Sequence, residues 1–242
     1  MSPVLPPLPE AFDWQGGQIT AALPGGQLLF TTRLEGSRGA PVDLKHWTEP
    51  AVQEALAAQI GLSPSRLAQG RQVHEAGVRA VVTEDDLQAP PSDDDAQVTT
   101  LASVACVVRT ADCVPIALVA PEAAGVVHAG WRGLALGVVQ AAVAELRELG
   151  ATGIAAAIGP SARVCCYEAG EDVHAAFAGF GARARSGSHA DLAAVARAIL
   201  ADEGVTEIRD TGLCTICAPD LFWSFRREGE AAGRQGVATW RS

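Results

Sequence analysis

Runs of apolar, β-branched residues recur along the chain and are separated by turn residues. Five strands are predicted on this basis, because such runs between turns are typical of strands buried in a sheet. They are QLLFTTR (residues 27–33), residues 78–82, and the central runs SVACVVRT, CVPIALVA and GVVHA. GIAAAIGP adds another strand, and the final GVATW adds a last short one.

Other stretches place apolar residues at helical spacing. Helices are predicted at residues 51–62, closed by Gly61, and from about residue 134 to residue 149. Two more are predicted within residues 169–180 and 190–204. Because strands and helices are interleaved without strict alternation, the pattern favours an α+β fold over a doubly wound one. We expect a single domain of mixed β-sheets covered by helices, a layered α/β/β/α-like sandwich, over residues 27–242. The proline-rich start predicts an extended N-terminal lead-in over residues 1–26.

Charge and composition limit the classes of partner. The chain has 242 residues, 48% of them hydrophobic, and a formal charge of −10 from 18 basic and 28 acidic residues. This balance argues against a nucleic acid or an anionic membrane as the partner, so an anionic substrate needs a local cationic pocket. Neither a signal peptide nor a membrane-spanning run is recognisable. We therefore expect a soluble, cytoplasmic protein.

Two groups of polar residues are interpreted as ordinary features. The segment EDDLQAPPSDDD (residues 84–95) is expected to be an exposed, solvated acidic loop rather than a cation site. Six cysteines are too few for a disulfide scaffold over this length. The CTIC motif with the pair Cys165 and Cys166 fits half a structural zinc site or a redox pair. The absence of a second CxxC favours ordinary buried thiols.

Three side chains stand in short motifs that point to a metal: His74 in RQVH, Cys113 in TADC and His128 in HAGWRG. Two imidazoles and one thiolate are sufficient donors for zinc, and three protein ligands leave the fourth tetrahedral position open. Cys113 and His128 are expected at strand ends. A competing hypothesis makes Cys113 a nucleophile activated by His74 or His128, with Asp112 orienting the base.

Two arginines are the best candidates for binding an anionic group. Arg33 ends a predicted strand, and Arg132 lies where the chain turns into a helix. Strand ends and helix N-termini are the places where such groups are bound.

The motifs RQVH, TADCVPI, HAGWRGL, IGPSARVCCYEAG and FWSFRREG together resemble the YfiH-like family. Its members are named laccase-domain protein, polyphenol oxidase and purine nucleoside phosphorylase. The resemblance makes residues 27–242 a YfiH-like catalytic domain and assigns its zinc to His74, Cys113 and His128. It also places Arg33 in the pocket. Where the family has GDA, this chain has Asp94, Asp95 and Ala96, a departure expected to lie away from the ligands.

The resemblance implies a zinc-dependent purine nucleoside phosphorylase with adenosine deaminase activity. Its substrates would be adenosine, inosine, guanosine or methylthioadenosine, together with phosphate. A copper-dependent, laccase-like phenol oxidase is one alternative, since copper can replace zinc at nitrogen and sulfur ligands. A cysteine or metal hydrolase acting on amide bonds of cell-wall precursors is another, and an inert metal-bearing partner protein is a third. The oligomeric state is left open.

Overall fold

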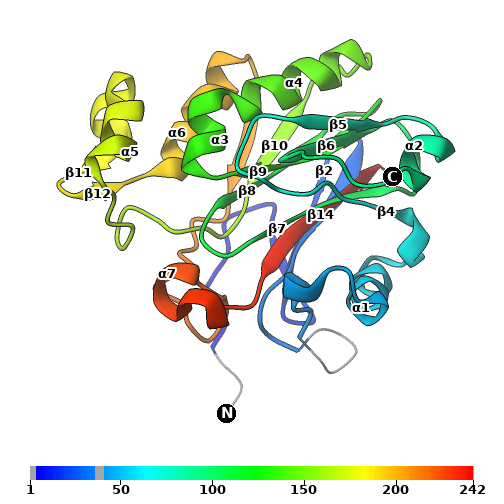
Figure 1. Ribbon diagram of the computed structural model, residues 1–242, viewed down its shortest axis with the longest axis horizontal. Helices are drawn as coiled ribbons and strands as arrows, with labels where there is room; N and C mark the ends of the chain where they lie inside the picture. The colour runs from blue at the N-terminus through cyan, green and yellow to red at the C-terminus, as the bar shows by residue number, and fades with distance from the viewer. Residues whose placement is uncertain (1–3, 36–40, 242) are drawn as a thin grey trace.

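Two six-stranded sheets lie face to face in the middle of the computed structural model, which describes residues 4–35 and 41–241 (Figure 1). In order across the first sheet, the strands are β1 (Asp13–Gln15), β2 (Gln18–Leu23), β3 (Gly26–Phe30), β14 (Gln235–Arg241), β7 (Ala105–Thr110) and β4 (Leu67–Ala68). Across the second they are β13 (Glu207–Asp210), β10 (Ala155–Ile158), β8 (Val114–Val119), β9 (Ala124–Ala129), β6 (Ala96–Thr99) and β5 (Val78–Val81). Each sheet mixes parallel and antiparallel pairs. The expected α+β fold is therefore confirmed.

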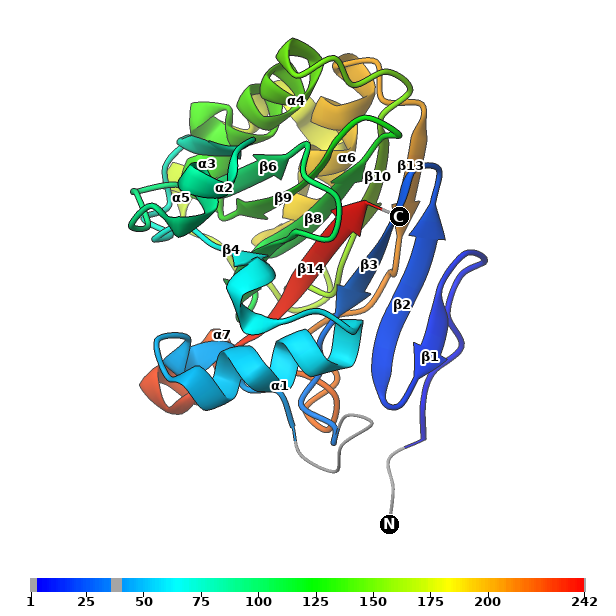
Figure 2. The same ribbon diagram turned by 90° about the vertical axis from the view of Figure 1, so that its right-hand side faces the viewer.

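Helices cover the outer face of each sheet. Figure 2 shows α1 (Pro50–Ile60) on one side and α4 (Val138–Glu148) with α6 (Leu192–Asp202) on the other. The remaining helices are short: α2 (Glu84–Gln88), α3 (Trp131–Leu136), α5 (Glu171–Ala176), α7 (Phe225–Glu228), and the 3-10 helices η1 (Leu44–His46), η2 (Pro64–Arg66), η3 (Ala178–Arg183) and η4 (Gly229–Ala231). A small hairpin joins β11 (Arg185–Ser186) to β12 (His189–Ala190). In the described ranges, no helix is both long and apolar enough to span a bilayer. The layers are thus α/β/β/α, as predicted.

The central strands are buried on both faces, which explains their continuous apolar sequences. In β8, Ile116 and Leu118 pack under the helices, whereas Ala117 and Val119 face the other sheet. Alternate residues of a strand point to opposite sides, so both sets must be apolar in a four-layer structure.

The helix predicted over residues 134–149 is two helices. Gly137 separates α3 from α4 and has a φ of 90°, in the left-handed region. The chain enters α3 at Trp131, directly after Gly130. The break lets α3 stay beside the end of β9 while α4 runs across the sheet.

The N-terminal segment differs from the expected lead-in. Residues 13–30 form three antiparallel strands at the edge of the first sheet. Gly16 and Gly17 both have positive φ and connect β1 to β2 as a two-residue hairpin turn. Ile19 on β2 is fully buried between the sheets and makes this segment part of the core.

We predict that Ile19→Ala destabilises the whole domain. Truncating a fully buried side chain of this size costs about 2–5 kcal/mol of unfolding free energy, because buried apolar surface is lost and a cavity is left behind. Denaturant unfolding measures the change, with Thr20→Ala, at a half-buried position on the same strand, as the matched control. Equal stability of the two variants would mean that β2 does not belong to the cooperative core.

Candidate metal centre

The structure brings His74, Cys113 and His128 together. One ligand atom from each of these side chains lies within 4.8 Å of the others. Cys113 Sγ is 3.9 Å from His74 Nε2, and the two imidazole rings meet edge to face with centroids 4.8 Å apart. Side chains from three separate segments therefore converge on one point.

The sheet register accounts for two of the three positions. Cys113 directly precedes β8, and His128 is the penultimate residue of β9. Because Pro115 pairs with His128 across these antiparallel strands, the start of β8 lies beside the end of β9. His74 comes from the loop between β4 and β5 and has a φ of 64°. This left-handed conformation is uncommon for a residue with a side chain and points to a functional constraint.

The donor set fits a zinc ion. In tetrahedral zinc sites, nitrogen and sulfur ligands lie about 3.4–3.6 Å apart, close to the separation of Cys113 and His74 seen here. Gly130 leaves room for this convergence, since a Cβ there would lie 2.9 Å from His74 Cδ2 and 3.3 Å from Cys113 Sγ. His128 is buried and His74 is exposed, so the cluster is open on one side.

Asp95 fixes two of the three candidate ligands, and the sequence interpretation missed it. Its Oδ1 atom lies 2.7 Å from His128 Nδ1, which leaves Nε2 of that ring for a metal. Its Oδ2 atom accepts hydrogen bonds from the backbone N–H groups of Val73 and Glu75, at 3.0 and 2.9 Å, on either side of His74. One carboxylate thus orients a ring and a loop.

The expectation of an exposed acidic loop over residues 84–95 is therefore wrong in part. Glu84–Gln88 forms α2, and a capping box with Thr83 caps its N-terminus. Asp93 is exposed and forms an ion pair with Arg71. Asp95, by contrast, is fully buried. The departure from GDA is Asp94 alone, whose carboxylate accepts a hydrogen bond from Ser92, whereas Asp95 is the aspartate that the family pattern shares. Asp94 and Asp95 are both buried, and the pairing of β6 with β9 places Asp95 beside His128.

The electrostatics of the cluster favour a thiolate. Burial raises the pKa of Cys113, but the adjacent His128 and His74 outweigh it and lower that pKa to about 6. Burial lowers the pKa of His128, but Cys113 and Asp95 outweigh it and raise that pKa to about 9. Since thiolates are the form of cysteine that binds metals, Cys113 is ready to do so at neutral pH.

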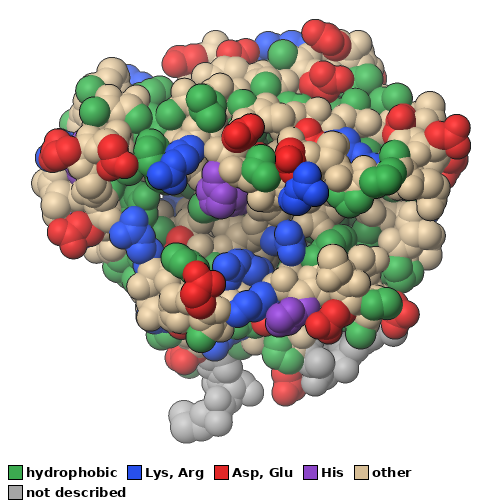
Figure 3. Space-filling view, viewed as in Figure 1, with side chains coloured by type: hydrophobic (Ala, Val, Ile, Leu, Met, Phe, Trp, Pro, Cys, Tyr) green, Lys and Arg blue, Asp and Glu red, His purple; other side chains and the backbone are tan. Residues whose placement is uncertain are grey.

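A cavity of about 570 Å³ opens beside the cluster. Figure 3 shows Lys and Arg side chains gathered around a hollow on this face of the molecule. Five cationic residues line the cavity: Lys45, Arg109, Arg132, Arg226 and Arg234. Among the described residues that line the cavity, Asp112 is the one acidic residue. This is the local cationic pocket that an anionic substrate requires in a chain of net charge −10.

Asp112 ties the Cys113 turn to the C-terminal segment. Its carboxylate accepts hydrogen bonds from Thr215 Oγ1 at 2.6 Å, Ser224 Oγ at 3.0 Å and the Arg226 backbone N–H at 2.7 Å. Its φ of 93° is a second left-handed position next to a candidate ligand. These bonds satisfy the carboxylate, so Asp112 is a structural anchor rather than the orienting group of a cysteine nucleophile.

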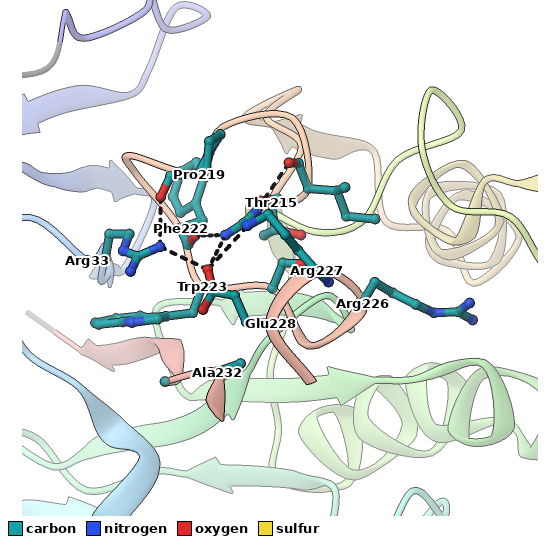
Figure 4. A network of polar contacts seen from close by, with 12 residues as sticks. Arg33, Thr215, Pro219, Phe222, Trp223, Arg226, Arg227, Glu228 and Ala232 are labelled. Atoms are coloured by element: carbon teal, nitrogen blue, oxygen red, sulfur yellow. Dashed lines mark hydrogen bonds and ion pairs between the residues drawn. The ribbon is translucent and has the colours of Figure 1, made fainter. Parts of the chain in front are cut away.

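The two arginines chosen from the sequence have different positions. Arg132 lines the cavity, with its guanidinium over the Trp131 ring. Arg33 is not among the residues that line it. Its Nη1 atom is 2.9 Å from Glu228 and 2.8 Å from the Pro219 carbonyl, in a network that also contains Arg227 (Figure 4). The structure therefore does not bring Arg33 to the metal cluster.

Comparisons with known proteins give a consistent result. Residues 49–242 match the model of the family described as multi-copper polyphenol oxidoreductase laccase. The chain is 41% identical to a purine nucleoside phosphorylase of Aquifex aeolicus over 59% of this chain and 69% of that protein. It is 37% identical to one of Deinococcus radiodurans over 85% of both, and 38% identical to adenosine deaminase RL5 of an unknown prokaryote over 77% and 79%.

Solved structures show the same fold. The YlmD protein of Geobacillus stearothermophilus superposes with a TM-score of 0.83 at 28% identity, over 96% of this chain and 99% of that one. A Neisseria meningitidis protein of the family DUF152 gives 0.78 at 31% identity, over 93% and 99%.

We predict that Asp95→Asn weakens zinc binding by about 10–100-fold, because the ring of His128 and the loop of His74 both lose their negatively charged partner. Competition with a chromophoric chelator measures the zinc affinity, and circular dichroism checks the fold. Asp93→Asn is the matched control, since Asp93 is exposed and contacts Arg71 instead. Unchanged zinc affinity in a folded Asp95→Asn variant would rule out the orienting role.

Proposed function

We propose that this chain, which belongs to the multi-copper polyphenol oxidoreductase laccase family, is a zinc-dependent purine nucleoside phosphorylase that also deaminates adenosine. Membership follows from the family match over residues 49–242 and confirms the resemblance seen in the sequence. The observation that carries the proposal is the coexistence, in one cavity, of the His74, Cys113 and His128 cluster with five cationic side chains. The cluster would hold the metal beside the nucleoside, and the cationic side chains would bind phosphate.

Phosphate is assigned to the side of the cavity formed by Arg109 and Arg234. Burial lowers the pKa of Arg109, and the nearby Arg234 lowers it further, so the two guanidinium groups are close and repel each other. A phosphate bound between the two guanidinium groups would relieve this repulsion.

The purine nucleoside is assigned to the aromatic part of the same cavity. Trp131, Tyr167 and Phe225 line it, and Arg226 lies over the Tyr167 ring at 4.8 Å. Flat aromatic side chains bury the faces of a purine, while the polar groups around them fix its orientation. Adenosine, inosine, guanosine and methylthioadenosine share this purine and its ribose, so one pocket accepts all four.

His74, Cys113 and His128 would hold the zinc ion, which supplies a Lewis acid beside the bound substrate. Asp95 keeps the His128 ring in place through its Nδ1 hydrogen bond. In phosphorolysis, Arg109 and Arg234 hold phosphate while one of its oxygens forms a bond to ribose C1′. The bond from C1′ to the purine nitrogen breaks, and that nitrogen takes up a proton. In deamination, water replaces the amino group at C6 and ammonia leaves.

A laccase-like multicopper centre does not fit the chain. Such a centre needs several imidazole-rich copper sites, and the sequence has five histidines. Among the described residues, His46, His174 and His189 belong to no cluster of metal-binding side chains. Copper at the His74, Cys113 and His128 site would therefore be a single substituted ion.

A cysteine hydrolase is the second candidate, favoured by the low pKa of Cys113 beside His128. A thiolate and imidazolium pair of this kind acts as a nucleophile without any metal. The two candidates differ in their response to metal removal and in their need for phosphate.

We place the protein in the cytoplasm and its substrates among small molecules. All six cysteines are free thiols in the described chain, which fits a reducing compartment. The five cationic residues of the site line a cavity of small-molecule size, so no nucleic acid or membrane is invoked.

The proposal predicts phosphate-dependent release of adenine from adenosine and phosphate-independent formation of inosine. Both products are identified by chromatography, with and without phosphate. Cys113→Ala should abolish both reactions, because the metal loses its thiolate ligand. Cys106→Ala, which alters a buried thiol in the core between the sheets, should retain them. Activity that survives complete chelation, or that ignores phosphate throughout, would contradict the proposal and favour the thiolate nucleophile.

Arg234→Gln should raise the KM for phosphate by about 10–100-fold, the loss expected for hydrogen bonds to a charged group. The KM for adenosine and the deamination rate should stay near their original values. Arg33→Gln is the matched control, because Arg33 contacts Glu228 outside the cavity. If the KM for phosphate rose only in the Arg33 variant, the phosphate site would lie at Arg33, as the sequence predicted.

A further inference from the structure

A second cluster of thiols lies in two loops that the proposed reaction does not use. Cys165 and Cys166 follow β10, and Cys214 and Cys217 follow β13. One sulfur atom from each lies within 4.8 Å of all the others. Cys217 Sγ is 2.9 Å from Cys166 Sγ and 3.4 Å from Cys165 Sγ. The expectation of ordinary buried thiols is wrong for Cys165 and Cys217, which are exposed.

We propose that these four cysteines form a closed tetrathiolate site for a thiophilic divalent ion, with zinc as its occupant. In a tetrahedral zinc site with four sulfurs, the sulfur atoms are about 3.8 Å apart, within the range found here. Four protein ligands leave no open position, so this site is structural. It is separate from the cluster of His74, Cys113 and His128.

The two loops are already joined in the geometry that such a site needs. The Thr215 N–H donates to the Ser161 carbonyl at 3.0 Å, and the Ser161 N–H donates to the Leu213 carbonyl at 3.3 Å. These bonds pair the chain ahead of Cys165 with the chain around Cys214. The CxxC spacing then turns Cys217 back toward the other sulfurs, the arrangement that gives half of a zinc site.

Backbone N–H groups stabilise a thiolate at Cys214. Burial raises the pKa of this thiol, but N–H groups of Cys217, Arg163 and Ile216 outweigh it and lower the pKa. Crowding has the opposite effect on the neighbouring thiols. Burial together with Cys217 raises the pKa of Cys165 to about 11. A divalent cation would supply the charge that lets all four sulfurs ionise.

Two arginines, each ion-paired with a carboxylate, hold the backbone around Cys214 in place. Arg163 Nε donates to the Leu213 carbonyl at 3.3 Å, next to Cys214. Arg227 Nη1 donates to the carbonyls of Thr215 and Ile216, at 2.7 and 3.0 Å, as Figure 4 shows for Thr215. Both arginines thus fix the carbonyls of the loop that carries Cys214 and Cys217, and such outer contacts orient the ligands of a metal site.

No disulfide joins these four cysteines in the structure: all four are free thiols, and their sulfur atoms share one small region. Both loops also border the substrate cavity. Tyr167, next to Cys166, lines the substrate cavity, and Thr215, between Cys214 and Cys217, donates to Asp112. An ion here would fix one wall of the cavity.

The test compares zinc content and zinc coordination in three forms of the full chain, loaded with zinc under reducing conditions. Elemental analysis should give two zinc ions per chain in the unaltered protein. Cys113→Ala and the double variant Cys165→Ser with Cys217→Ser should each hold one. X-ray absorption at the zinc edge of the Cys113→Ala protein should show a shell of sulfur ligands only.

The Cys113→Ala measurement does not depend on whether the double variant folds, nor on any enzymatic activity. A Cys113→Ala protein without zinc would overturn the proposal. So would a zinc shell containing nitrogen or oxygen, or four thiols that react freely with a thiol reagent in the zinc-loaded protein. A disulfide bond between Cys217 and Cys165 or Cys166 in the reduced, zinc-loaded protein would also overturn it.

Discussion

The buried contact between the Asp95 carboxylate and the His128 ring is the interaction on which the rest of the candidate metal centre depends. A buried carboxylate is costly unless its oxygens are all engaged. Here one oxygen meets the ring and the other accepts two backbone N–H groups beside His74, so the pKa of Asp95 stays lowered although burial opposes it. A single charged side chain thereby aligns two imidazoles toward Cys113.

The sheet supplies the precision that this arrangement requires. Asp95 directly precedes β6, and its carbonyl accepts the backbone N–H of His128 at 2.7 Å. The pairing of β6 with β9, and of β9 with β8, then places Asp95, His128 and Cys113 at the same end of three neighbouring strands. A loop contributes His74, and four of the five cationic residues of the cavity lie on β7, η1, α3 and α7. The ends of paired strands thus hold two of the three candidate ligands in fixed positions.

The sequence predicted the elements whose pattern is unambiguous. Doubly buried strands, the helix closed by Gly61 and the layered α/β/β/α arrangement are all found. The three side chains of the candidate metal centre were identified through their motifs, and the structure brings them together. Asp95 was not, because neighbouring aspartates look alike until strand pairing places one of them beside His128. Arg33 was misplaced for a related reason, since its partner Glu228 is 195 residues away in the sequence.

The most direct test of this account is a crystal structure of zinc-loaded protein with anomalous diffraction measured at the zinc edge. The account predicts an anomalous peak bound by Nε2 of His74, Sγ of Cys113 and Nε2 of His128, with Nδ1 of His128 still held by Asp95. A zinc-free His74, Cys113 and His128 cluster in zinc-saturated crystals would contradict it. So would Asp95 bound to the ion as a ligand in place of one of the three.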